Sequence, residues 1–167
     1  MIPKFPDIRD AALFEEMREV GTKLLWLHTY GERHVPKGCR RGQVPEGSTR
    51  CTRAVPGDKD SYPASYDYND AAKTLSVGAG AFAPVAPNMY NLEVSGLKVV
   101  QSWLGYRMRN PKGKKSSPLD DIHPEKWTGD FTTELLEVLW NLEATIAQYP
   151  RQAKLLTAMT KGAKIHP

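Results

Sequence analysis

Strand-like segments follow one another through the middle of this chain, with no crossover helix between them. Alternating residues at 65–69 and 74–77, joined by a turn at 69–72, predict a β-hairpin. Further short strands are expected at three places: residues 50–55, 81–85 and 89–94. Consecutive strands favour hairpins over parallel pairing, so we expect an α+β fold with a small antiparallel sheet flanked by three to four helices and long basic loops.

Apolar residues recur at helical spacing on both sides of these strands. The expected helices cover residues 11–30, residues 95 or 96 to 108, a stretch that begins at a cap of Thr128 or Asp130 and ends at Pro150, and residues 151 to about 160. Gly31 and Pro150 are the expected stops of the first and third helices, because neither residue continues a helix well. In the second helix, Trp103 and Tyr106 are expected to be core anchors.

Length and composition favour one folded domain over residues 1–167. The chain has 167 residues, of which 40% are hydrophobic, which is enough for a core. No apolar run approaches the length of a membrane span, and the first six residues lack a signal-peptide pattern. With only Cys39 and Cys51 there is no disulfide framework, so a cytoplasmic protein is expected.

The net charge of +4 is modest, but the basic residues are clustered. Residues 32–57 hold six basic side chains and two acids: the basic ones are Arg33, Lys37, Arg40, Arg41, Arg50 and Arg53. Residues 97–118 hold six more and no acid: Lys98, Arg107, Arg109, Lys112, Lys114 and Lys115. Such clustering suits a polyanionic partner, because bound cations release counterions from phosphates. The alternative is two solvated loops.

The second basic cluster combines several kinds of DNA-contacting side chain. The lysines at 112, 114 and 115, with the hydroxyls of Ser116 and Ser117, suit phosphate oxygens. Arg107 and Arg109 can also donate two hydrogen bonds to a guanine edge. One of these arginines could instead pair within the chain with Asp120 or Asp121.

No pattern in the sequence indicates catalysis, a metal or a cofactor. The glycine-rich segment 77–82 is similar to a nucleotide-binding loop, but Pro84 and Pro87 follow it where a helix should begin, so we expect a tight β-turn. The four histidines and two cysteines lack zinc-site spacing. His28, near the end of a helix, is expected to have a hydrogen-bonded packing role.

Acidic residues allow one catalytic alternative, a small metal-dependent nuclease. Glu134 and Glu137, with Lys126, are explained more simply as a solvated helix face. Convergence of Asp120, Asp121 and Glu125 on a metal would favour the nuclease.

One stretch has a specific resemblance. Residues 93–104, EVSGLKVVQSWL, continue through Gly105-Tyr106-Arg107 to the SSPLDDI of residues 116–122. With the helix ending LLWLH at 24–28, they resemble the C-terminal specificity region of type ISP restriction–modification enzymes and related adenine-specific DNA methyltransferases. The methyltransferase catalytic and methyl-donor motifs of those enzymes are absent here.

The resemblance implies binding of double-stranded DNA and recognition of a target sequence, with the chemistry performed by other domains of the enzyme. A methyltransferase domain is the implied protein partner. The resemblance identifies no base-contacting residue, so the candidate residues above are chosen from their local chemistry alone. The alternatives are a structural or protein-interaction lobe that packs on a methyltransferase or helicase domain, and the small nuclease.

Overall fold

The computed structural model describes residues 11–108 and 126–162. The chain divides into two compact units. The helical unit contains residues 1–45 and 144–167, and the sheet unit contains residues 46–143. The strands follow one another within the sheet unit, which confirms the α+β class. The single domain over residues 1–167 stays a prediction.

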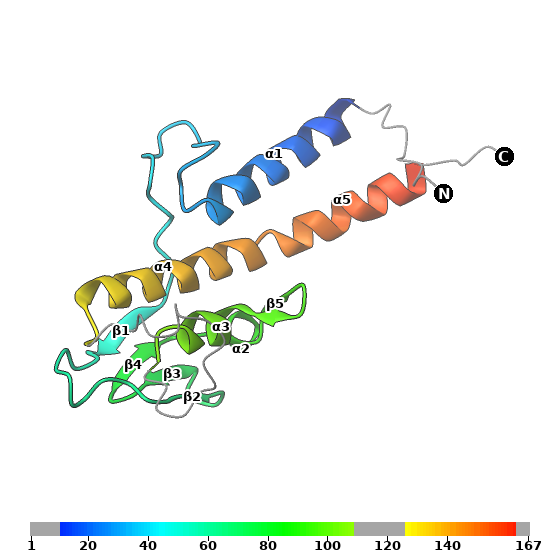
Figure 1. The fold of residues 1–167 in the computed structure, drawn as a ribbon. Coiled ribbons are helices and arrows are strands. Elements are labelled where there is room, and N and C mark those ends of the chain that lie inside the picture. Colours follow the sequence, from blue (N-terminus) through cyan, green and yellow to red (C-terminus); the bar gives the residue numbers. More distant parts are fainter. Residues whose placement is uncertain (1–10, 109–125, 163–167) are drawn as a thin grey trace. The chain divides into compact units, whose positions relative to one another are not determined.

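Two helices that are far apart in the sequence pack together in the helical unit (Figure 1). They are α1, Ala11–His28, and α5, Tyr149–Gly162. Val20 and Leu27 of α1 and Leu155 of α5 are buried, as the apolar stripe of α1 predicts. Arg151 joins the two helices through an ion pair of 2.7 Å with Glu19. The N-terminal helix is thus confirmed within two residues.

The end of α1 differs from the expected glycine stop. Tyr30 takes the left-handed conformation, with φ of +50°, and its amide donates to the Leu27 carbonyl. The amide of Gly31 donates to the Trp26 carbonyl at 2.9 Å, which completes a Schellman motif. Gly31 itself has φ of +79° and lies against the backbone of Gln43. Glycine at residue 31 therefore allows the backbone at residues 31 and 43 to come into close contact, which a side chain would prevent.

The sheet unit contains four short antiparallel strands in the order β1-β4-β3-β2. Their bounds are Arg50–Arg53 for β1, Tyr66–Asn69 for β2, Thr74–Val77 for β3 and Gly80–Ala83 for β4. Tyr68, Leu75, Phe82 and Cys51 lie opposite one another across the sheet, and Leu75 and Phe82 are fully buried. The predicted hairpin at 65–77 is confirmed.

The segment between the sheet and α3 differs from the prediction. Of the strand expected at 89–94, only the end, Glu93–Val94, is a strand. Its start lies in a short helix, α2, Pro87–Tyr90, with proline at the first position, where the fixed φ suits a helix. The next helix, α3, runs only over Val99–Gly105, not from 95 or 96 to 108. Residues 93–98 form a small hairpin, with β5 at Glu93–Val94 and β6 at Leu97–Lys98. Ser95 and Gly96 both have positive φ, which excludes a helix there.

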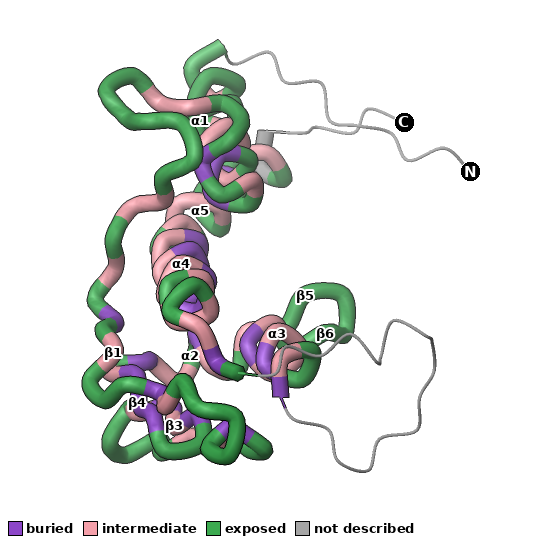
Figure 2. Tube along the Cα trace, turned by 60° about the vertical axis from the view of Figure 1, so that its left-hand side comes forward, coloured by how far each residue is buried: buried purple, intermediate pink, exposed green. Residues whose placement is uncertain are grey.

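The long helix α4, Gly129–Ile146, is the third predicted helix, but Pro150 does not stop it, because that proline lies in the first turn of α5. In the sheet unit, its Trp140 indole donates to the Thr49 carbonyl at 2.9 Å, and Glu143 accepts from the Ser48 amide at 2.7 Å. Buried residues of the sheet unit lie in β3, β4, α3 and α4 (Figure 2). Among the helices of residues 11–108 and 126–162, none is both long and apolar enough to cross a membrane.

Candidate nucleic-acid interface

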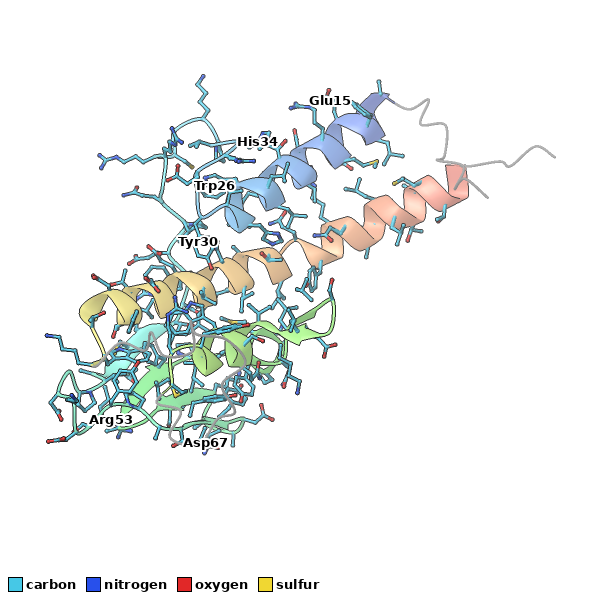
Figure 3. The ribbon with its side chains drawn as sticks, in the orientation of Figure 1. Glu15, Trp26, Tyr30, His34, Arg53 and Asp67 are labelled. Atoms are coloured by element: carbon cyan, nitrogen blue, oxygen red, sulfur yellow. The ribbon has the colours of Figure 1, made fainter. Side chains whose placement is uncertain are left out.

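The loop that follows α1 is a strongly basic surface of the helical unit. Residues 31–42 contain four basic side chains and one acid, which leaves a net charge of +3. All five of these residues are exposed, and most of the loop is coloured as exposed in Figure 2. The loop lies beside the C-terminal part of α1, where Figure 3 labels His34 on it. Its composition and exposure suit contact with a polyanion.

The four basic residues of loop 31–42 differ in whether they have a partner. Arg41 donates from Nε to Glu32 at 2.7 Å, so this pair is neutral. Within residues 11–108 and 126–162, the side chains of Arg33, Lys37 and Arg40 form no ion pair or hydrogen bond. Three cations are therefore available to a ligand.

The two arginines of β1 are exposed but already bind the backbone. Arg50 donates to the carbonyls of Gly47 and Thr49, and its guanidinium lies 5.7 Å from the ring centre of Trp140. Arg53, labelled in Figure 3, donates to the Ala79 carbonyl across the sheet. These contacts fix the position of both side chains and leave some of their donors to solvent.

Arg107 lies at the end of α3 in an aromatic cluster. Its guanidinium stacks on Trp103, 3.9 Å from the ring centre, and donates to Glu134 at 2.7 Å. Its carbonyl accepts from the Tyr62 hydroxyl at 2.6 Å. Burial raises the pKa of Tyr62, and the positive charge of Arg107 opposes that shift. Arg107 thus has an internal acidic partner, Glu134. Asp120 and Asp121, the partners considered from the sequence, lie outside the described residues.

The remaining candidates lie outside the described residues. They are Arg109, Lys112, Lys114, Lys115, Ser116 and Ser117. The acids Asp120, Asp121 and Glu125 of the nuclease alternative lie there too. Their proposed roles stay predictions.

The two aromatic residues expected to anchor the core behave differently. Trp103 is half-buried and makes an edge contact with Trp127, with ring centres 6.4 Å apart. Tyr106 is 80% exposed, so its prediction as a core anchor is wrong. The helix α3 ends at Gly105, which places Tyr106 beyond the face that packs. An exposed tyrosine is instead available at the surface.

The described residues contain no group of three or more histidine, cysteine or acidic side chains that could hold a metal. Glu134, one of the acids considered for a nuclease, is paired with Arg107. The glycine-rich segment forms the tight turn between β3 and β4, with Gly78 at φ of +54°, as predicted. His28 has the expected hydrogen bond, 3.2 Å from the Thr145 hydroxyl.

Sequence reasoning missed the closure of loop 31–42. The Gly42 amide donates to the Gly31 carbonyl at 3.2 Å, and the Glu32–Arg41 pair lies directly beside this bond. The sequence does contain a signal, since glycines flank an acid and a base at the two ends of the loop. Charge counting treated Arg41 as equivalent to its neighbours, although its side chain is already paired.

Comparison with known proteins gives one family. The family model of the type ISP C-terminal specificity domain matches residues 1–138. Neither the curated proteins nor the solved structures contain a match. The matched region includes α1, the basic loop, the sheet and the first part of α4, which is most of the chain. The protein therefore belongs to the family of type ISP C-terminal specificity domains.

Proposed function

We propose that this chain binds double-stranded DNA and recognises a target sequence, as the specificity domain of a type ISP restriction–modification enzyme. The family match over residues 1–138 carries this proposal. Three exposed cations of loop 31–42, whose side chains have no partner among the described residues, support it, because phosphate neutralisation supplies much of the affinity of DNA-binding proteins.

In this proposal the chain has no catalytic residue of its own. Methylation and cleavage belong to other domains of the enzyme, and a methyltransferase domain is its protein partner. The exposed cations give affinity, whereas a few side chains at base edges give specificity, each worth about 1–3 kcal/mol. Arg107 and Arg109 remain the predicted contacts for this second task, and the lysines and serines of segment 112–117 remain predicted phosphate contacts. The protein acts in the cytoplasm, where a restriction system meets DNA.

Fluorescence anisotropy with labelled duplexes of mixed sequence, titrated across salt concentrations, tests DNA binding. If about six phosphates are contacted, the logarithm of the binding constant should fall with a slope near −5 against the logarithm of salt. Selection from a random duplex pool then tests sequence recognition, and one enriched sequence is the expected result. A chain that binds no duplex at low salt, or that enriches no sequence, contradicts the proposal.

A second role, as a lobe that packs on a neighbouring domain, is favoured by one observation. Phe14 and Leu25 of α1 are 53% and 51% exposed, and eleven residues of helix separate them, so they lie on the same face. Sedimentation of the chain tests this role, because an unpaired apolar face promotes association. Replacement of both residues by serine should abolish association, and a chain that is monomeric at every concentration opposes it.

A further inference from the structure

The two ends of loop 31–42 are held together by contacts between residues 31–32 and 41–43, which we call the neck. The opposite end, residues 36–39, is a turn that we call the tip. At the neck, the Gly42 amide bonds to the Gly31 carbonyl, and Gly31 lies so close to Gln43 that a Cβ would be 2.5 Å from its carbonyl oxygen. The Glu32–Arg41 ion pair spans the same neck. This closure holds the two ends of the loop together independently of any ligand.

The tip is a tight turn that projects a lysine. The Cys39 amide donates to the Pro36 carbonyl at 3.0 Å, which defines a β-turn with Lys37 as its second residue. Gly38, the third residue, has φ of +88°, as a type II turn requires. Arg33 and Arg40 lie between the neck and this tip. The backbone therefore fixes where the three cations emerge.

The side chains themselves are not fixed. In the described part of the chain, Arg33, Lys37 and Arg40 have no side-chain partner that would hold a rotamer. A side chain that reads a base edge needs such support, because bidentate recognition depends on orientation. A phosphate contact needs only a positive charge at the right distance.

We propose, building on the DNA-binding function above, that Arg33, Lys37 and Arg40 form a phosphate-binding surface that contributes affinity for duplex DNA without reading its sequence. Arg41 is a positioning residue in this surface. It neutralises Glu32, the one acid of the loop, and closes the neck, so it makes no phosphate contact itself.

The test compares two triple variants of the full chain. In the first, Arg33, Lys37 and Arg40 are replaced by glutamine. In the matched control, three exposed lysines outside both basic clusters, Lys73, Lys126 and Lys154, are replaced by glutamine, which changes the net charge equally. Anisotropy against a preferred and an unrelated duplex measures the salt slope and the ratio of the two affinities.

The loop variant should lose about 2.7 from the magnitude of the salt slope, because each phosphate contact contributes about 0.9. The ratio of the affinities for the two duplexes should stay unchanged. The control variant should lose less than about 0.9 from the magnitude of the salt slope, which is the contribution of one phosphate contact. A changed ratio would mean that the loop reads bases, which overturns the proposal. Equal behaviour of both variants, with a parent that binds DNA, overturns the proposal but leaves the DNA-binding function standing. A parent that binds no duplex overturns both.

Arg41 is tested by exchange of its charge with that of its partner. The double variant with Glu32→Arg and Arg41→Glu keeps the ion pair and the loop charge. If Arg41 is a positioning residue, this double variant should have the same salt slope as the parent. Its circular dichroism spectrum should show that it is folded. If Arg41 contacts a phosphate directly, the exchange should lower the magnitude of the slope by about 0.9. That result would reassign Arg41 to the phosphate-binding surface.

Discussion

At the scale of single residues, Gly31 is where loop closure depends on the absence of a side chain. Gly31→Ala should lower the free energy of unfolding by about 1–2 kcal/mol for the left-handed backbone. The clash with Gln43 should add about 1–3 kcal/mol. Urea denaturation followed by circular dichroism measures the change.

Gly38→Ala is the matched control for Gly31→Ala. Gly38 also has positive φ, of +88°, but no atom lies within 4 Å of where its Cβ would be. Only the backbone cost of about 1–2 kcal/mol should remain. Equal losses in the two variants would show that the loop neck relaxes without the close approach of residues 31 and 43.

Arg107 needs a test that separates folding from DNA contact. Arg107→Ala should cost about 1–2 kcal/mol of unfolding free energy, because it removes the stacking on Trp103 and the partly exposed ion pair with Glu134. Arg33→Ala should change that free energy by less than about 0.5 kcal/mol, since Arg33 is exposed. An Arg107→Ala variant of parental stability that has lost DNA affinity would instead make Arg107 a dedicated DNA contact.

At the scale of elements, the predictable parts are those whose signals are local. The hairpin of β2 and β3 was predictable because Tyr66 and Tyr68 alternate with polar residues, and Asn69 begins the turn by accepting from the Ala72 amide. The hairpin of β5 and β6 was not, because Ser95-Gly96 before an apolar run is also typical of a helix start. Only two consecutive left-handed residues distinguish the two structures.

The candidate site was predictable in the same limited sense. Composition located the basic loop, because clustered charge is visible in any sequence. Which cation is free depends on which acid comes near, and contacts such as that of Arg107 with Glu134, 27 residues apart, are set by packing. Local pattern contains no information on such pairs.

The short helix α3 allows a matched pair of substitutions at the element scale. Leu104 is fully buried, whereas Leu97, in β6 just before α3, is 64% exposed. Leu104→Ala should lower the free energy of unfolding by about 2–5 kcal/mol. Leu97→Ala should change it by less than about 0.5 kcal/mol. Chemical denaturation of both variants is the measurement, and a large cost at Leu97 would mean that the hairpin packs on the protein.

At the scale of the whole molecule, the proposed DNA contacts belong to two different units. Arg33, Lys37 and Arg40, whose side chains have no partner among the described residues, belong to the helical unit, whereas Arg50, Arg53 and Arg107 belong to the sheet unit and are bound to their own surroundings. The proposal therefore predicts that affinity from the helical unit and orientation-dependent contacts from the sheet unit are separable by mutation. The two units can therefore differ in their local stability.

Amide hydrogen exchange should show that the helical unit opens more easily than the sheet unit. In α1 only Val20, Trp26 and Leu27 are buried, whereas β3 and β4 bury most of their residues. Local opening free energy follows the amount of buried apolar contact, so amides of α1 and α5 should exchange before those of β3 and β4. Mass spectrometry of exchanged peptides measures the order. Equal exchange rates in the helices and the strands would contradict this order. They would mean that the two units open together in one cooperative unfolding reaction.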